Sequence, residues 1–364
     1  MTHDPQVAAV AALGKISPED FARVIAPHLG AARPEVLVGP RAGHDCAIVK
    51  VGAGRVMAIT TDPLSLIPAL GPERSARLAC HLIASDLWTS GIPPAFATLD
   101  FNLPPQLSAT EFERYWTAMS TAWRELEVAV VSGHTGRYEG CDFSIIGAGT
   151  LIGIGDEGRY VTPAMAAPGD RLIVTKGCAI EATAIAAHLI PDVLATRLDE
   201  EQMARARAMI DQVSVVRDCR AAVRVGVRDR GVSALHDATE GGVLGGLIEL
   251  AQACGHDLRV ERARIPLSDE ARAACEALGG IDPFWTLSEG TLIAAVRPAQ
   301  AKAVLAAMAE ENIVAAEVGE VMPGHGVLYL TESDGRVVQL TQPETDPWWK
   351  AYGRLAHPRG TAHS

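Results

Sequence analysis

The segment His236-Asp-Ala-Thr-Glu-Gly-Gly-Val243 constrains this chain most, because it sets an acid, a hydroxyl and two glycines before a long apolar helical pattern. The first turn of a helix has free N–H groups and the positive end of the helix dipole, which together favour an anion such as phosphate. Gly241 and Gly242 would let backbone approach a phosphate, and Asp237 could hold a divalent cation beside it. An ordinary helix cap explains the same letters, since Asp and Thr are good caps. The segment alone therefore leaves two interpretations open.

Three further aspartates stand at the ends of elements in the first half of the chain. Asp45 lies in a glycine-punctuated loop, Asp62 ends an apolar strand that Pro63 closes, and Asp86 lies late in a helix that Gly91 terminates. The helix dipole disfavours an acid at that position, so Asp86 indicates a compensating cation. Each aspartate alone also fits a cap, a turn or a solvated surface. Their recurrence favours a shared site.

A second glycine-rich segment follows an apolar strand over residues 128–132. Gly133, His134 and Thr135 form a small polar loop whose amides and hydroxyl could bind a phosphate or a base. A metal-ligand role for His134 is weakly supported, because no second His or Cys lies at ligand spacing. The alternative is a β-turn that carries a surface imidazole.

Composition limits the class of protein. A chain of 364 residues can hold two full cores, and a hydrophobic content of 48% with a mean hydropathy of +0.14 indicates compact globular packing. The seven cysteines include no CxxC pair, which predicts reduced thiols in a cytoplasmic protein. No apolar run is long enough to cross a bilayer, and no secretory signal opens the chain. The net charge of −12 argues against a nucleic-acid partner.

The hydrophobic patterns predict two α/β (α+β) units joined near residues 160–168. In the first unit we expect strands near 47–51, 55–62, 95–101, 128–132 and 143–152, with helices near 75–90 and 109–126. In the second we expect strands near 171–176, 258–264, 290–296 and 314–320, with helices near 179–190, 200–225, 241–254, 268–278 and 298–311. The expected domains are residues 1–165 and 166–345, followed by a tail over 346–364.

Taken together, these motifs resemble those of the aminoimidazole-ribonucleotide (AIR) synthetase superfamily, which includes selenophosphate synthetase, thiamine-monophosphate kinase and the hydrogenase-maturation dehydratase HypE. The resemblance covers roughly residues 15–345 and keeps the order of the motifs. The matching segments are Gly43-His-Asp-Cys-Ala47, Thr60-Thr-Asp62, Ser85-Asp-Leu87, Gly91-Ile-Pro93, Ser132-Gly-His-Thr135, Pro168-Gly-Asp170, His236-Asp-Ala-Thr-Glu-Gly-Gly242 and Ser288-Glu-Gly290.

The resemblance implies a two-domain AIR-synthetase-like fold, with an N-terminal mixed sheet that forms a barrel in a homodimer and a C-terminal α/β sandwich. It also implies ATP and Mg²⁺ as cofactors, and an unidentified small-molecule or protein-borne acceptor whose carbonyl or amide-type oxygen is phosphorylated. By their place in the family's motifs, the expected metal ligands are Asp45, Asp86 and Asp237. The expected nucleotide contacts are Asp62, Gly133, His134, Thr135, Gly241 and Gly242, and the expected catalytic residues are Glu289, His134 and Asp237.

Among the branches, HypE is the most similar, but two of its features are missing. HypE ends in a cysteine that carries the carbamoyl group, whereas this sequence has no cysteine after Cys275. HypE also has a lysine directly after its Gly-Asp-Thr, where this chain has Gly136. Selenophosphate synthetase needs a lysine in an N-terminal glycine-rich loop; the comparable loop, Gly39–Gly43, has Arg41 in its place. A small-molecule kinase and a nucleotide-binding scaffold in a maturation complex remain the alternatives.

A cysteine and a pair of tryptophans are the last features to interpret. Cys178 stands at a strand end before a helix, where the dipole favours a reactive thiolate, although a buried structural cysteine is the simpler interpretation. Trp348 and Trp349 are interpreted as a hydrophobic clasp that docks the end of the chain.

Overall fold

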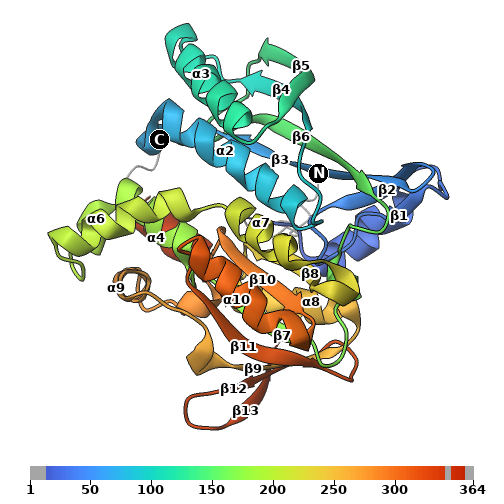
Figure 1. Cartoon of the computed structure of the whole chain (residues 1–364). Helices are drawn as coiled ribbons and strands as arrows, with labels where there is room; N and C mark the ends of the chain where they lie inside the picture. Colours follow the sequence, from blue (N-terminus) through green and yellow to red (C-terminus); the bar gives the residue numbers. More distant parts are fainter. Residues whose placement is uncertain (1–13, 341–345, 357–364) are drawn as a thin grey trace, which may run out of the picture.

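The structure, a computed structural model of the whole chain, describes residues 14–340 and 346–356 and consists of two α/β units (Figure 1). Each unit is built on its own sheet, and the two units meet where helix α2 (Gly71–Trp88) of the first lies against α7 (Val216–Val225) and strand β8 (Val232–Ala238) of the second. The fold class expected from the sequence is therefore present.

The first unit contains a six-stranded mixed sheet in the order β1-β2-β3-β6-β4-β5. Neighbouring strands run antiparallel except for the last pair, β4 and β5, which is parallel. Helix α2 and helix α3 (Ala109–Glu125) pack side by side against one face (Figure 1). The strands are β1 (Val36–Val38), β2 (Ala47–Gly52), β3 (Arg55–Ser65), β4 (Phe96–Leu103), β5 (Ala129–Arg137) and β6 (Ile145–Asp156).

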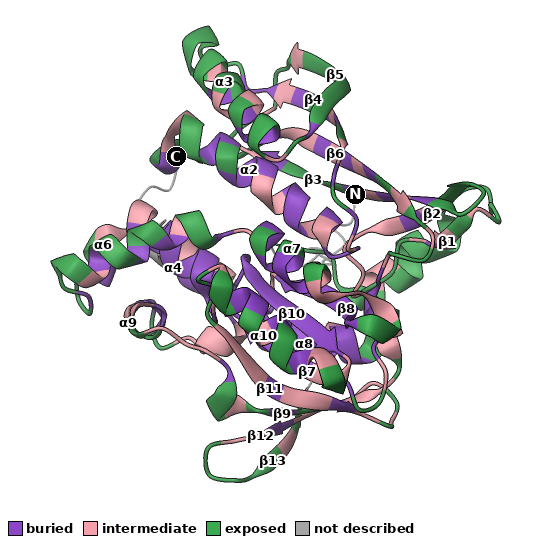
Figure 2. Ribbon diagram, in the orientation of Figure 1, coloured by how far each residue is buried: buried purple, intermediate pink, exposed green. Residues whose placement is uncertain are grey.

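Only one face of this sheet is covered by helices of the described chain. Strand β3 alternates buried and exposed side chains, with Val56, Ala58 and Thr60 turned toward the helices, as a half-covered sheet requires. Figure 2 shows β5 largely exposed, whereas every second residue of β4 is buried. The opposite face exposes large apolar side chains, including Ile145 at 55% and Ile154 at 41%.

The second unit contains a seven-stranded sheet in the order β13-β12-β9-β11-β7-β10-β8. Its inner strands are buried on both faces, because α8 (Gly242–Cys254) packs on one side and α7 with α10 (Ala301–Glu310) on the other (Figures 1 and 2). This is the expected sandwich. The strands besides β8 are β7 (Arg171–Thr175), β9 (Asp257–Glu261), β10 (Thr291–Val296), β11 (Ala315–Met322), β12 (Leu328–Thr331) and β13 (Val337–Leu340).

A further apolar cluster is formed where α4, α6, α9 and α11 pack together beside the sheet of the second unit. The C-terminal helix α11 buries Trp348 in this cluster, which confirms the predicted clasp. The helices are α4 (Ile180–Leu189), α5 (Pro191–Leu194), α6 (Glu200–Ala208), α9 (Asp269–Ala277) and α11 (Pro347–Ala356); a short α1 (Pro18–Asp20) lies near the start of the described chain.

The helix expected over residues 200–225 is two helices. It divides into α6, a 3-10 turn over Met209–Gln212, and α7. The break includes Val213 and Val215, whose β-branched side chains have low helix propensity. Ser214 between them contacts the Nδ1 atom of His81 through its hydroxyl at 3.0 Å, which ties the break to α2.

Three segments interpreted as loops or strand ends belong to longer strands. Strand β5 runs on through His134 to Arg137, so the expected turn is absent. Strand β3 continues past Asp62, because β2 pairs with β3 only as far as Ile59 and Pro63 needs no partner on that side. His236 and Asp237 lie in the buried strand β8. This strand was not predicted from the sequence, because both residues are polar.

Among the described residues, no helix has both the length and the apolar character needed to span a bilayer.

Candidate active site: a carboxylate cluster between the two sheets

Four aspartates from separate elements come together where the two units meet. Asp45 comes from the loop before β2, Asp62 from β3, Asp86 from late α2 and Asp237 from the end of β8. Their carboxyl groups perturb one another: burial raises the pKa of Asp86 well above its ordinary value, and the charges of Asp237, Asp62 and Asp45 raise it further. The structure thus brings together all four aspartates that the sequence singled out.

Thr60 ties two of these acids to the first sheet. Its hydroxyl lies 2.9 Å from the Asp45 carbonyl oxygen and 3.1 Å from a carboxylate oxygen of Asp86, and a hydroxyl has one proton to share between them. The Asp45 loop and the end of α2 are therefore held at a set distance.

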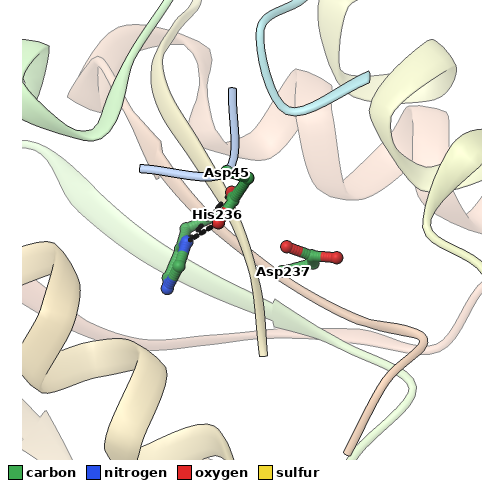
Figure 3. Close-up of side chains that lie close together, drawn as sticks. All are labelled: Asp45, His236 and Asp237. Carbon is green, nitrogen blue, oxygen red and sulfur yellow. Dashed lines mark hydrogen bonds and ion pairs between the residues drawn. The ribbon is translucent and has the colours of Figure 1, made fainter. Parts of the chain in front are cut away.

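His236 lies between the carboxylates of Asp45 and Glu249, and Figure 3 shows the contact with Asp45. Its Nδ1 is 2.9 Å from Asp45, and its Nε2 is 2.9 Å from Glu249 of α8. Burial opposes a charge on the imidazole, but both carboxylates favour it and raise the pKa of His236 well above its usual value. Burial likewise opposes ionisation of Asp45 and Glu249, yet His236 holds both carboxyl pKa values below normal. The three groups form a buried ion triad.

Asp237 is buried, at 1% exposed, without a hydrogen-bond donor of ordinary geometry among the described residues. Burial first, and then the charge of Asp45, raises the pKa of Asp237 to about 7, while a side-chain interaction with its carboxyl neighbour Glu289 lowers it slightly. A buried carboxylate without a donor is costly, and a bound cation would remove that cost.

The donor set fits a hard divalent cation such as Mg²⁺, which takes carboxylate oxygens. Atoms of Asp45, His236 and Asp237 lie within 4.8 Å of one another. His236 is not a suitable ligand, because both ring nitrogens already face carboxylates and its raised pKa keeps both protonated. The imidazole therefore orients Asp45, and the carboxylates are the groups that could hold a cation.

A second group of buried acids adjoins the first. Glu289, in the turn before β10, is 7% exposed; burial and the charge of Asp237 raise its pKa well above normal. Glu181, in the first turn of α4, was not identified from the sequence; burial and then Glu240 raise its pKa to about 8. Glu289 is thus adjacent to the aspartates, as expected, and Glu181 extends the site toward α4.

The N-terminal end of α8 consists of glycines, as the sequence suggested, but it is not capped by Asp237 or Thr239. Gly242 has φ of +63°, and a Cβ there would lie 2.6 Å from the Phe284 carbonyl oxygen. No Asp or Thr side chain caps the helix; instead the Gly241 amide donates to the Asp346 carboxylate at 2.7 Å. The local-cap interpretation is wrong, because Asp237 and Thr239 precede the helix in and just after a strand.

Gly133, His134 and Thr135 lie apart from the acids within one chain. They pair with Leu99, Asp100 and Phe101 of β4 at the sheet edge, and strands β4 and β6 separate them from β3. His134 contacts the Tyr138 hydroxyl at 2.8 Å. The interpretation as a loop is wrong, because pairing with β4 outweighs the turn preference of glycine.

Two basic residues and one thiol complete the comparison with the sequence. Arg41 is exposed, whereas Lys15, which sequence reasoning overlooked, reaches the site: its ammonium group donates to the Thr239 hydroxyl at 2.9 Å. The signal was a glycine-lysine pair just before the Ser17 cap of a helix. Cys178 is buried, which raises its thiol pKa well above normal and fits the structural interpretation.

Two α/β units that face each other across a shared site form the two-domain AIR-synthetase-like fold. The chain belongs to the AIR synthase related proteins: the family model of their N-terminal domain matches residues 43–154, and that of their C-terminal domain matches residues 167–331.

Individual relatives point to one branch. Carbamoyl dehydratase HypE of Bradyrhizobium diazoefficiens is 28% identical over 316 residues, which cover 84% of this chain and 86% of that protein. The crystal structure of E. coli HypE, a hydrogenase maturation protein, is similar with a TM-score of 0.68 and 26% identity over 80% of this chain and 87% of that one. A structure of HypE in complex with ATP has a TM-score of 0.65 at 23% identity, covers 92% of this chain and 97% of its own, and shows likeness of fold.

Proposed function

We propose that this chain is a Mg²⁺- and ATP-dependent enzyme that phosphorylates a carbonyl or amide-type oxygen of an acceptor. One observation carries the proposal: four aspartates converge at the junction of the two units, and Asp237 among them is buried without a cationic group or a hydrogen-bond donor of ordinary geometry bonded to it among the described residues. ATP carries several negative charges, and a divalent cation bound by aspartates neutralises them during phosphoryl transfer. The relatedness to carbamoyl dehydratases and the ATP complex of a structural neighbour support the same chemistry.

In the proposed reaction, the acceptor oxygen bonds to the γ-phosphorus of ATP, and the bond from that phosphorus to the β–γ bridging oxygen breaks to release ADP. If the acceptor is a carboxamide, the phosphorylated oxygen then leaves as inorganic phosphate while the nitrogen loses its two protons, and the net change is a dehydration. If the phosphorylated acceptor is stable, it is the product, and the enzyme is a kinase.

The residues divide into a cation side and an acceptor side. Asp45, Asp86 and Asp237 hold the cation, with His236 fixing the orientation of Asp45. Asp62 faces the metal or the nucleotide. Glu289, whose raised pKa favours a protonated carboxyl, lies where an acceptor would meet the cluster and can exchange a proton with it.

We further propose that the active form is a homodimer with its domain boundary near residue 165 in each chain. The uncovered face of the first sheet supports this proposal, because it exposes apolar side chains such as Ile145 and Ile154. A second copy on this face would also offer a route by which Gly133, His134 and Thr135 could approach a nucleotide. Residues 347–356, expected as part of a tail, form α11, which packs in the apolar cluster of helices beside the second unit.

Phosphate and ADP release by the purified protein with Mg²⁺ and ATP tests the proposal, measured alone and against a panel of amides, carboxylates and thiamine monophosphate. Asp237→Asn should abolish ligand-stimulated turnover without unfolding the protein, since it removes one unpaired buried charge. Asp229→Asn, at a side chain 96% exposed, is the matched control and should retain full activity.

One outcome would contradict the enzyme, and a second would show that the chain does not act alone on these acceptors. If Asp237→Asn raised the melting temperature while turnover or partner binding stayed unchanged, the acids would have no catalytic role, and the scaffold would be the better interpretation. If no member of the panel stimulated turnover while ATP still raised the melting temperature, the chain would act with a partner protein or as a nucleotide-gated scaffold.

A further inference from the structure

A cleft separate from the carboxylate cluster opens where α2 of the first unit meets α7 of the second (Figure 1). Its volume is about 570 Å³, and the four aspartates of the candidate active site are not among its lining residues. The first unit contributes one side of α2 and the end of α3. The second contributes the segment that leads into α7, the residue after β7 and the turn before β11. We call this space the junction cleft.

The cleft is lined by basic residues from both units. Arg74, Arg77, Leu78 and His81 recur along α2 at intervals of three and four residues, which places them on one side of the helix. Two arginines of α7, three residues apart, line the cleft from the second unit, and a lysine follows β7. The basic residues of the cleft are Arg74, Arg77, Lys176, Arg217 and Arg220.

The charge of the junction cleft is opposite to that of the chain. Five basic and three acidic side chains line the cleft, whereas the whole chain has a net charge of −12. Three of the basic residues have a carboxylate partner, but Arg74 and Arg220 form no ion pair with another described residue. Both are exposed to solvent. Their guanidinium groups can therefore attract an anion, and the fork of donors in arginine fits a phosphate group.

Two buried polar atoms in the walls of the cleft have no partner among the described residues. They are Nε2 of His81 and Oδ1 of Asp218. Burial, and then the charge of Arg77, lowers the pKa of His81 to about 4, so the imidazole is neutral at pH 7. Its Nδ1 lies 3.0 Å from the Ser214 hydroxyl; a neutral ring that accepts the hydroxyl proton there carries its own proton on Nε2. Buried polar atoms are normally paired, so both indicate a polar group that enters the cleft.

The cleft also has an apolar part. Leu78, Val213, Val216 and Ile313 line it and are buried. A volume of about 570 Å³ lies within the range of about 300–1,000 Å³ that is typical of small-molecule sites, and inorganic phosphate alone would leave most of it empty. A ligand with a charged end and an apolar body would use both kinds of wall.

We propose that the junction cleft is a second binding site, for a small organic phosphate whose charged end lies among the arginines and whose body lies against Leu78 and Ile313. This proposal goes beyond the proposed function and does not depend on it, because it needs neither ATP nor a metal ion. The site is nevertheless close to the acids: a Cβ at Gly290, the residue after Glu289, would overlap the carbonyl oxygen of Gln212, which lines the cleft.

A phosphorus NMR titration of the full chain with phenyl phosphate and with inorganic phosphate, in metal-free buffer without nucleotide, tests the proposal. Phenyl phosphate should bind at least about fivefold more tightly, because burial of its ring adds to the same charged contacts. The double variant Arg74→Gln with Arg220→Gln should weaken phenyl phosphate binding at least about tenfold, through loss of charged hydrogen bonds. The matched double variant Arg197→Gln with Arg230→Gln removes the same charge from exposed positions outside the cleft, and should keep the affinity within about twofold.

A further variant tests the cleft without removing an arginine. Asn312 lines the cleft, is exposed and has φ of +57°, a conformation that Asp also tolerates. Asn312→Asp should therefore weaken phenyl phosphate binding at least about threefold by repulsion, at an unchanged melting temperature.

Four outcomes would overturn the proposal. The wild type would bind no phenyl phosphate at about 10 mM, or would bind it no better than inorganic phosphate. Binding would persist in Arg74→Gln with Arg220→Gln and in Asn312→Asp, which would place the ligand elsewhere. Finally, the two double variants would lose affinity equally, which would show a general effect of charge. None of these results bears on ATP turnover, so the proposed function is tested separately.

Discussion

At the scale of single residues, the triad Asp45–His236–Glu249 is the part of the site with the clearest energetic consequence. An imidazolium between two buried carboxylates satisfies both, whereas a neutral side chain in its place leaves two negative charges facing one pocket. Removing one member of a buried ion pair costs about 3–5 kcal/mol. The histidine therefore determines whether the Asp45 loop keeps its place.

His236→Gln should destabilise the protein by about 3–5 kcal/mol, measured by urea unfolding at pH 7. The double variant His236→Gln with Asp45→Asn should recover part of that loss, because it removes one of the two unpaired charges. Equal unfolding free energies for wild type and His236→Gln would contradict the triad.

The triad also predicts how stability depends on pH. The folded-state pKa of His236 is raised, so its contribution is complete below the unfolded value of about 6.5 and is lost as the pH rises through the folded value. The folded-state pKa values of Asp45 and Glu249 are lowered, so their contribution is complete above about pH 4.5 and is lost on acidification. Urea midpoints for His236→Gln should lack the alkaline loss that the wild type shows.

At the scale of elements, helix α8 joins the glycine motif to the second core. Gly242 at its start and Gly255 just after its end both have positive φ, at +63° and +68°. Their surroundings differ: a Cβ at Gly242 would collide with backbone atoms of Phe284 and Thr286, whereas a Cβ at Gly255 would have open space. A comparison of alanine substitutions at the two positions therefore separates the cost of backbone strain from the cost of a steric clash.

Gly255→Ala should cost about 1 kcal/mol, the strain of a left-handed residue, and Gly242→Ala should cost at least about 2 kcal/mol more because backbone must also move. Chemical denaturation of both variants measures the difference. Similar losses at the two ends would mean that the turn at Gly242 has room to rearrange.

The elements also show what a sequence can and cannot predict. Helices such as α3 and α8 follow clear apolar patterns, and both were expected within a few residues of their observed bounds. Strand β8 was missed, because burial on both faces removes alternation and its two polar residues belong to the site. Gly133 and Gly136 made the end of β5 look like a loop. Its pairing with β4 is a long-range interaction, which the local sequence does not reveal.

The acids of the site were recognised from their positions in motifs, whereas their partners were not. Asp45, Asp62, Asp86 and Asp237 each end or follow a marked element, so the sequence singles them out. Glu249, Glu181 and Lys15 lie within or before helices, where Glu and Lys are usually solvated. Only the packing of α8, α4 and residues 14–17 against the cluster distinguishes these three residues from solvated ones.

At the scale of the whole molecule, the two faces of the first sheet are unequal. Helices α2 and α3 cover one face, while the other exposes Ile145 and Ile154 of β6. Apolar side chains in this number on one sheet are typical of an interface. Strand β5 ends this face, so a second copy would meet Gly133–Thr135, for which we propose a nucleotide contact, as well as the apolar surface.

Ile145→Arg should therefore shift the protein from dimer to monomer in sedimentation velocity at micromolar concentration, because it places a charge in an apolar interface. Val314→Arg is the matched control: that side chain is 64% exposed on the second unit, and its substitution should leave the dimer intact. The monomeric variant should also bind Mg²⁺-AMPPCP at least about tenfold more weakly, although its carboxylate cluster is unaltered, because Gly133–Thr135 would no longer be supplied by a partner. A wild-type monomer, or a monomeric variant with full nucleotide affinity, would place the whole site within one chain and leave β5 without a role in it.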